Sequence, residues 1–543
     1  MLWQCRRGAR GRLFCVQALM KKRPFASHSI TVFANRGACK YSQAMRSLFV
    51  IIFWSLLLVL LPAPPLPAQT PVPAQGALTE AKQLFRKADF RAAADAFRKL
   101  TDAKPSAEAY AGLVQSLLKA DDVQAAEDIS RKALQALPES PLVHASRGDV
   151  YFRLGKILEA DAEYKAALKL DGKSSRGWLG QGKVDAVLAR NAKSKAAIAK
   201  AHELDPEDGD ALYEWAVRLP YPENVAALER HLAEYHNDAE VERHERKYME
   251  FVKAIAGRKV WVPAREVERT EIKMELLTAG PSLARRGYGL RVRLNDRANV
   301  TLLLDTGSSG VTITRKLAEK IGARKLSEQA LEGVGKTGPA VGYKAWVDKV
   351  AIGELEFHDC FVHATPREFA EVDGMIGTDV FAKYLITLDH PGRKLRLDPL
   401  PPPREENLAA PAEPFTQTFS FGHFLLVPTE VGKKAAGLFV IDSGANANTI
   451  SPKLGNLVPE MRAYNLPISG ASGKVNSAFI AENATMRFAK VNRTGERIST
   501  VDLHSVSKDL GVEISGQIGF SALEGMKVII DYRDGLVEFV GKQ

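Results

Sequence analysis

The segment Leu302-Leu303-Leu304-Asp305-Thr306-Gly307-Ser308 recurs in a second form as Phe439-Val440-Ile441-Asp442-Ser443-Gly444-Ala445. In each copy an apolar strand ends in an aspartate, and the glycine that follows allows a tight turn. Such a segment delivers a carboxylate to the floor of a cleft, and two copies deliver two carboxylates that face one another. A carboxylate pair that shares one proton can hydrolyse a peptide bond with water.

The sequence around the two triplets matches as well. Each triplet is followed by a β-branched stretch, a short helix, a glycine-rich hairpin tip and a closing Gly-x-Ile-Gly turn. These matched pieces are 311–322 and 448–455, Gly333–Gly338 and Ser469–Gly473, and Gly374–Gly377 and Gly516–Gly519. The duplication predicts two similar all-β lobes, over 270–398 and 415–543, with a semi-rigid proline-rich linker over 399–414 between them.

This set of motifs, present twice in the same order, resembles the aspartic proteases of the retropepsin-like and pepsin-like group. The resemblance implies one active site made by two lobes of one chain, with Asp305 and Asp442 as the catalytic pair and with neither metal nor cofactor. The residues that it implies as supports of this pair are Thr306, Gly307, Ser308, Ser443 and Gly444. The residues that it implies for the flaps over a bound peptide are Gly333, Gly335, Gly338, Gly470 and Gly473.

The two copies differ at the fourth position of the motif. Ser308 carries a hydroxyl that is able to donate a hydrogen bond to Asp305, whereas Ala445 has no such group for Asp442. Because a donor stabilises the charged form of a carboxylate, the sequence predicts that Asp305 is the more acidic member. Neither hairpin tip shows the flap tyrosine of pepsins, so the resemblance is nearer to retropepsins there.

Residues 76–220 differ in composition, being rich in Ala, Leu, Lys, Glu and Asp, and their pattern repeats every 33 or 34 residues. The repeat ends are marked at Pro105, Pro138, Gly172 and Pro206. The pattern resembles the tetratricopeptide repeat (TPR), which implies an all-α solenoid with a concave face that binds a protein or peptide partner. The alternative is a spacer without a ligand. The charged residues 221–265 predict capping helices and a linker to the β lobes.

The net charge of +11 comes almost entirely from the first 68 residues, which hold ten Lys and Arg and no Asp or Glu. The remainder carries 65 basic and 64 acidic residues, so it offers no electrostatic reason to expect a nucleic-acid partner. Cys360 is the only cysteine after this leader, which excludes an intrachain disulfide and a cysteine-rich metal site in the body of the protein.

The apolar run Leu48–Leu61 is too short for a bilayer span, which needs roughly 20 residues, and a proline- and alanine-rich stretch follows it. Residues 45–68 are therefore predicted to be a secretory signal peptide, and residues 1–44 an upstream extension, either from a misassigned start or as a very long n-region. The expected location is exported, either periplasmic or secreted. An uncleaved membrane anchor is the alternative.

The resemblances together indicate an aspartic endopeptidase with a helical-repeat domain in front of two retropepsin-like lobes, acting on a peptide or protein substrate. A second hypothesis keeps the fold without the enzyme, as a peptide-binding scaffold. A third hypothesis is a dimeric protease, in which a lobe of one chain pairs with a lobe of another.

Overall fold

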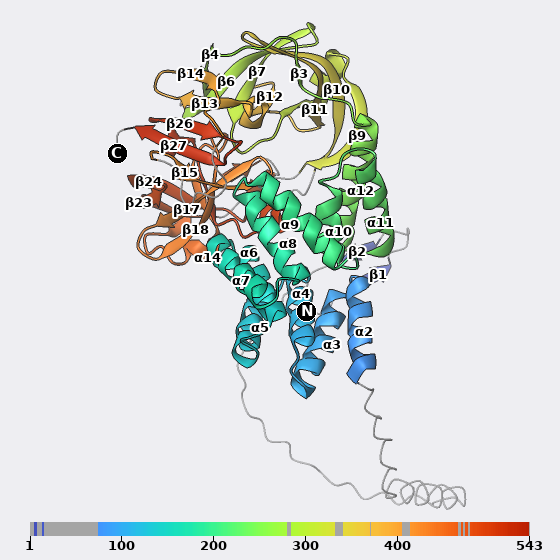
Figure 1. The fold of residues 1–543 in the computed structure, drawn as a ribbon. Helices are drawn as coiled ribbons and strands as arrows, with labels where there is room; N and C mark the ends of the chain where they lie inside the picture. The colour runs from blue at the N-terminus through green and yellow to red at the C-terminus, as the bar shows by residue number, and fades with distance from the viewer. Residues whose placement is uncertain are drawn as a thin grey trace, which may run out of the picture. The chain divides into compact units, whose positions relative to one another are not determined.

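The computed structural model in Figure 1 describes residues 5–7, 13–15, 74–279, 284–331, 340–369, 371–403, 413–464, 468–470, 473–475 and 478–541. The chain divides into two compact units, Met1–Pro71 and Val72–Gln543. In the first unit β1 (Cys5–Arg7) pairs antiparallel with β2 (Leu13–Cys15). The rest of the predicted extension and the whole predicted signal peptide lie outside the described residues. Among the helices that are described, none combines the length and apolar character of a membrane span.

The second unit begins with helices that pair antiparallel. They are α2 (Ala74–Arg86), α3 (Phe90–Ala103), α4 (Ala107–Lys119), α5 (Val123–Ala136), α6 (Pro141–Arg153), α7 (Ile157–Leu170), α8 (Ser175–Val187), α9 (Asn191–Leu204), α10 (Gly209–Ala216), α11 (Glu223–Glu234) and α12 (Ala239–Ile255). A residue in the left-handed conformation turns the chain inside successive pairs, at Ala88, Asp121, Gly155 and Ala189. Side chains cap the first helix of successive pairs at Ser106, Ser140, Ser174 and Asp208. These local signals recur with the period found in the sequence, and the predicted helical repeat is confirmed.

Small residues let the repeats pack closely. Tyr164 of α7 is fully buried, and its ring lies directly over Gly148 of α6 and Gly180 of α8. Its hydroxyl donates to Asp149 over 2.8 Å. A side chain at either glycine would collide with this ring, so the repeat sequence sets the spacing of three helices.

Lobe 1 is built around a mixed sheet. Its strands are β3 (Val262–Pro263), β5 (Glu275–Ala279), β6 (Ala284–Leu294), β7 (Ala298–Asp305), β8 (Val311–Thr314), β9 (Arg324–Leu331), β10 (Ala340–Ile352), β11 (Leu355–Thr365) and β12 (Gly374–Gly377). The helices of this lobe are α13 (Arg315–Lys320) and the 3-10 turn η2 (Thr378–Phe381). The strand β12 runs parallel to β7 and pairs Gly377 with Asp305, so the Gly-x-Ile-Gly motif lies beside the aspartate strand.

Lobe 2 repeats this plan in a second sheet. Its strands are β16 (Phe419–Phe421), β17 (Phe424–Val431), β18 (Ala435–Ile441), β19 (Asn448–Ile450), β20 (Arg462–Tyr464), β23 (Ala478–Phe488), β24 (Val491–Thr500) and β25 (Gly516–Ile518). The helices are α14 (Pro452–Gly455), α15 (His504–Leu510) and α16 (Phe520–Leu523). Here β25 runs parallel to β18, which ends one residue before Asp442. The predicted fold of a helical repeat followed by two β-rich lobes is confirmed.

A third sheet joins the two lobes. Its strands, in spatial order, are β15 (Thr416–Gln417), β27 (Leu536–Gly541), β26 (Met526–Asp531), β13 (Tyr384–Asp389), β14 (Lys394–Pro399) and β4 (Thr270–Lys273). At its centre β13 of lobe 1 pairs with β26 of lobe 2, with Ile386 opposite Ile530. One hydrophobic core contains buried residues of both lobes. The lobes therefore share a sheet and a core and are held in a fixed relation to each other.

The predicted flap hairpins are partly described. Gly333, Gly335 and Gly338 lie outside the described residues, whereas Gly470 and Gly473 pair with each other where β21 (Ile468–Gly470) meets β22 (Gly473–Val475). Their role as flaps stays a prediction.

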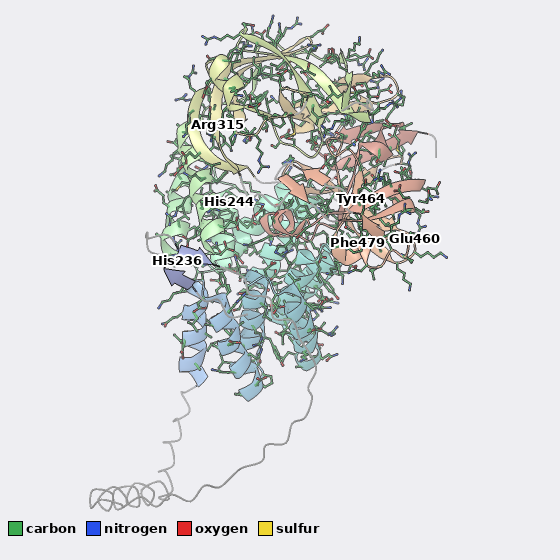
Figure 2. The ribbon with its side chains drawn as sticks, turned by 180° about the vertical axis from the view of Figure 1, so that it is seen from behind. His236, His244, Arg315, Glu460, Tyr464 and Phe479 are labelled. Atoms are coloured by element: carbon green, nitrogen blue, oxygen red, sulfur yellow. The ribbon has the colours of Figure 1, made fainter. Side chains whose placement is uncertain are left out.

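The strand that returns from each tip exposes an apolar side chain near its start. Val341 in β10 is 58 % exposed, and Phe479 in β23 is 53 % exposed. Figure 2 shows Phe479 near Tyr464 on lobe 2, and shows Arg315 of lobe 1, which donates a hydrogen bond to the carbonyl of Val341. The two hairpins therefore resemble each other in exposure as well as in sequence.

The helical repeats pack against lobe 2. A shared apolar cluster joins residues of α6, α7 and α8 to residues of β16, β18 and the segment around α15. Within it the rings of Phe152 and Phe421 lie 5.9 Å apart, and the N–H of Glu513 donates to the carbonyl of Arg153 over 2.8 Å. Against lobe 1, the ring of Phe251 in α12 packs 5.0 Å from Phe361. One edge of the repeat domain is thus an internal interface.

Candidate active site

The two aspartates of the repeated motif meet. Asp305 ends β7 and Asp442 follows β18, and both side chains are buried, with 7 % and 8 % exposure. The two carboxyl groups are hydrogen-bonded to each other. Two strands from different lobes of one chain therefore end at one pair of carboxyl groups.

The glycines of the two triplets lie against this pair in a crossed arrangement. A Cβ placed on Gly307 would stand within 2.9 Å of the Asp442 carboxyl atoms. A Cβ on Gly444 would stand closer still to the Asp305 carboxyl. Each lobe therefore supplies one carboxyl group and the side-chain-free backbone that makes room for the other.

The second residues of the triplets tie the lobes together beneath the carboxyl groups. The Ser443 N–H donates to Thr306 Oγ1 over 2.9 Å, and the Thr306 N–H donates to Ser443 Oγ over 3.1 Å. The hydroxyls in turn donate to opposite carbonyls, Thr306 to Ile441 over 2.7 Å and Ser443 to Leu304 over 3.1 Å. The two hydroxyls retained in the sequence thus form a reciprocal, fully buried link.

The acidity of the two aspartates differs in the direction opposite to the sequence prediction. Burial, and then the negative charge of Asp442, raise the pKa of Asp305 well above its ordinary value. Burial also raises the pKa of Asp442, but hydrogen bonds from the Ala445 and Gly444 N–H groups, from Asp305 and from the amide of Gln517 oppose that rise. Asp305 is therefore the member that favours the proton.

The reason for this error lies in the fourth position of each motif. Ser308 donates its backbone N–H to the carbonyl of Asp305. At the matching position the backbone N–H of Ala445 donates to Asp442 Oδ1 over 2.8 Å, beside that of Gly444 over 3.1 Å. A backbone N–H does not depend on the side chain, and of these two N–H groups that of Ala445 is the one bonded to a carboxyl oxygen, so the choice of serine or alanine does not decide which carboxyl is the more acidic.

Three polar residues that the sequence did not single out surround the site. Asp379 accepts hydrogen bonds from Ser309 Oγ and from the Gly310 N–H, at 2.8 and 2.9 Å, and so fixes the loop after Asp305. His423 of lobe 2 places Nε2 3.4 Å from the Gly307 carbonyl oxygen. Burial lowers the pKa of His423, which favours the neutral ring.

Gln517 is the third of these residues, and it donates from Nε2 to Asp442 Oδ2. It occupies the variable position of the second Gly-x-Ile-Gly motif, where lobe 1 has Met375. This difference within a recognised motif is a sequence signal by which Gln517 could have been found. His423 and Asp379 lie in no such motif.

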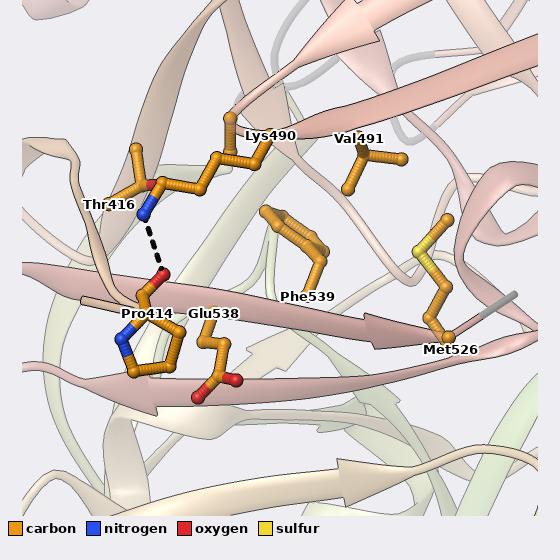
Figure 3. A pocket seen from close by; sticks show the side chains of 9 residues that line it. Pro414, Thr416, Lys490, Val491, Met526, Glu538 and Phe539 are labelled. Atoms are coloured by element: carbon orange, nitrogen blue, oxygen red, sulfur yellow. Dashed lines mark hydrogen bonds between the residues drawn. The ribbon is translucent and has the colours of Figure 1, made fainter. Parts of the chain in front are cut away.

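Metal sites and pockets are the other kinds of site to consider in the described part of the chain. No group of three or more His, Cys, Asp or Glu side chains is arranged there to hold a metal ion. A pocket on lobe 2, shown in Figure 3, is lined by residues that include Pro414, Lys490 and Phe539, and Lys490 Nζ donates to the Pro414 carbonyl over 3.1 Å. Its lining includes neither aspartate.

Comparison with known proteins gives a match at the first lobe. Residues 290–380 match the family model described as aspartyl protease, a span that includes Asp305 and the first Gly-x-Ile-Gly motif. No match is found among curated proteins. The first lobe therefore carries the predicted likeness to aspartyl proteases, and the helical repeat followed by two β-rich lobes agrees with the predicted architecture.

Two solved structures are similar to separate parts of the chain. An aspartic proteinase from Irpex lacteus is 12 % identical, with 51 % of this chain and 98 % of that one covered and a TM-score of 0.33. A thermophilic TPR protein from Thermus thermophilus is 19 % identical, with 32 % and 97 % covered and a TM-score of 0.27.

Proposed function

We propose that this chain, with its TPR-like domain and aspartic protease lobes, is an endopeptidase in which Asp305 and Asp442 activate water. The observation that carries the proposal is the buried, mutually hydrogen-bonded carboxyl pair at the ends of two matched strands. Two carboxyl groups that are buried and hydrogen-bonded to each other do not both ionise, so the pair holds one proton over a wide pH range. The two resulting pKa values belong to the pair as a whole.

In the first step the ionised carboxylate takes a proton from a water molecule, and the water oxygen attacks the carbonyl carbon of the peptide bond. The protonated carboxyl gives its proton to the carbonyl oxygen, which yields a neutral tetrahedral diol and exchanges the protonation states of the two aspartates. In the second step the newly protonated aspartate gives its proton to the leaving nitrogen. The other aspartate takes a proton from one diol hydroxyl, the C–N bond breaks, and the starting state returns.

A peptide-binding scaffold without catalysis is the competing function. It would bury two carboxyl groups against each other, at a desolvation cost, without any use for their shared proton. The full set of supports around the pair, from the crossed glycines to the reciprocal hydroxyls, favours the enzyme. Pairing of lobes between chains is not required, because one chain supplies both aspartates to the same place.

The repeat domain is proposed to bind a protein or peptide partner on its concave face. We further propose that the protein is exported after removal of residues 45–68, or stays tethered if that segment is retained. Both proposals rest on sequence pattern.

The test of the enzymatic proposal is incubation of the full-length protein with a peptide library from acidic to neutral pH. The Asp305→Asn and Asp442→Asn variants are compared with Asp348→Asn, which changes an exposed aspartate in a surface ion pair with Arg324. Cleavage by the wild type and by the Asp348 variant, with loss in the other two, supports the dyad. Cleavage at the wild-type rate by either dyad variant would contradict the proposed dyad.

A further inference from the structure

The two Gly-x-Ile-Gly strands place different side chains at the same point of the two lobes. Met375 in β12 lies opposite Leu303, two residues before Asp305, and Gln517 in β25 lies opposite Val440, two residues before Asp442. A threonine is the antiparallel neighbour on the other side in both lobes, Thr312 for Met375 and Thr449 for Gln517. The neighbouring strands are therefore arranged in the same way in both lobes. At the matching position lobe 1 carries the thioether of Met375 and lobe 2 the amide of Gln517.

Hydrogen bonds fix the orientation of this amide. Thr449 Oγ1 donates to Gln517 Oε1 over 2.9 Å, and Gln517 Nε2 donates to Asp442 Oδ2. With its oxygen engaged by the threonine, the amide presents its N–H₂ to the carboxyl group. Because the side chain of Met375 has no N–H, it cannot form the equivalent bond to Asp305.

The consequence is an unequal supply of donors to the two aspartates. Asp442 accepts on Oδ1 from the N–H groups of Gly444 and Ala445 and on Oδ2 from Gln517, so donors reach both of its oxygens. Asp305 accepts on Oδ1 from the Gly307 N–H over 2.7 Å and has a second backbone donor in the N–H of Gly444, but the Met375 side chain offers it no amide. Donors to both oxygens favour the charged form of a carboxylate, and a carboxyl that keeps its proton must use one oxygen to donate.

We propose that Gln517 is a positioning residue that keeps Asp442 ionised, so that Asp442 takes the proton from water and Asp305 carries the proton given to the carbonyl oxygen. This assignment rests on the proposed function and adds to it the division of labour between the two aspartates. Gln517 acts through Asp442, held in turn by Thr449.

The test replaces the side chain at this position of lobe 2 with the one found in lobe 1. Gln517→Met gives lobe 2 the side chain of lobe 1, and the acidic limb of the kcat/KM profile reports ionisation of the dyad in the free enzyme. Loss of a donor to the charged form raises the pKa at which the dyad loses its first proton. The acidic limb is expected to move to higher pH by about one unit, with KM changed less than twofold.

Two further variants test the same role of the amide. One weakens its orientation, and the other moves the amide to lobe 1. Thr449→Val removes the hydroxyl that orients the amide and is expected to move the acidic limb in the same direction by a smaller amount. The double variant Gln517→Met with Met375→Gln supplies an amide from lobe 1 instead, and is expected to return the limb toward its wild-type position with the roles of the aspartates exchanged.

Two outcomes overturn the inference. One is an acidic limb that does not move in Gln517→Met, and the other is a change in KM alone, which would make Gln517 a substrate contact. Either result, obtained while Asp305→Asn and Asp442→Asn remain inactive, removes this assignment and leaves the proposed function intact. Failure of those two variants to lose activity would instead remove the proposed function.

Discussion

Thr306 and Ser443 hold each other across the two lobes, each accepting the backbone N–H of the other on its own side-chain oxygen. Both residues are nearly inaccessible to solvent, at 2 % and 4 % exposure. A buried N–H without an acceptor is costly, so this reciprocal link stabilises the relative position of the two carboxyl groups as well as the fold.

Thr306→Val is therefore expected to destabilise the protein by about 1–3 kcal/mol, since the buried N–H of Ser443 loses its acceptor. Urea unfolding gives this free energy, and a peptide-cleavage assay gives the accompanying loss of activity. Thr306→Ser keeps the hydroxyl and is the matched control. Equal stability of the valine variant and the wild type would contradict the structural role given to this link.

Gly444→Ala places a methyl group on the carboxyl of Asp305, and Gly307→Ala places one on the carboxyl of Asp442. Because a displacement of about 1 Å in a reacting group costs on the order of 100-fold in rate, each variant is expected to lose at least about that much in kcat/KM. Gly525→Ala in lobe 2 is the control, as a Cβ there meets nothing within 4 Å. Retention of wild-type cleavage by Gly444→Ala would show that the crossed glycines do not set the dyad geometry.

The raised pKa of Asp305 predicts a pH dependence of stability. A carboxyl whose pKa is higher in the folded state contributes stability that is complete below its unfolded value, 3.8, and is lost as pH rises through the folded value. Asp305→Asn does not titrate, so the variant is expected to gain stability relative to the wild type as pH rises above 3.8, by about 1.4 kcal/mol for each unit of pKa shift.

Urea unfolding of both proteins from about pH 4 to about pH 7 measures this difference. A difference that stays constant over the range, or that grows toward acid, would contradict the raised pKa.

The contact between the repeats and lobe 2 predicts that the two parts stabilise each other. Phe152 is 5 % exposed in the shared apolar cluster, and its truncation to alanine is expected to cost about 3–5 kcal/mol. Leu158, on the next helix, is 63 % exposed, so Leu158→Ala is the control and is expected to change stability by less than about 0.5 kcal/mol. Peptide cleavage measured at increasing urea concentration reports the unfolding of the protease lobes. A midpoint of activity loss unmoved by Phe152→Ala would mean that the repeats do not support the lobe.

Much of the fold could be predicted because its signals are local. The left-handed residues from Ala88 to Ala189 and the helix caps from Ser106 to Asp208 recur at the repeat period. Each aspartate is marked by the strand before it and the glycine after it. The joining sheet was missed, because the pairing of β13 with β26 depends on segments far apart in sequence that neither lobe contains alone.

The acidity of the dyad could not be predicted from the triplets for the same kind of reason. Gln517 lies 75 residues beyond Asp442 and reaches it only because β25 returns beside β18. His423 reaches Gly307 from the other lobe. The fourth position, where the side chains differ, acts through its backbone N–H, which donates to the Asp305 carbonyl in lobe 1 and to the Asp442 carboxyl in lobe 2.

Peptide cleavage by Asp305→Asn and Asp442→Asn tests whether the two aspartates of one chain form the active site. Cleavage is measured for each variant alone and for an equimolar mixture. If both aspartates of one chain form the site, each variant alone is inactive and the mixture is inactive too, since the lobes share a sheet and a core within the chain. Wild-type cleavage by either variant alone would contradict the dyad. Activity restored in the mixture would contradict a site built within one chain.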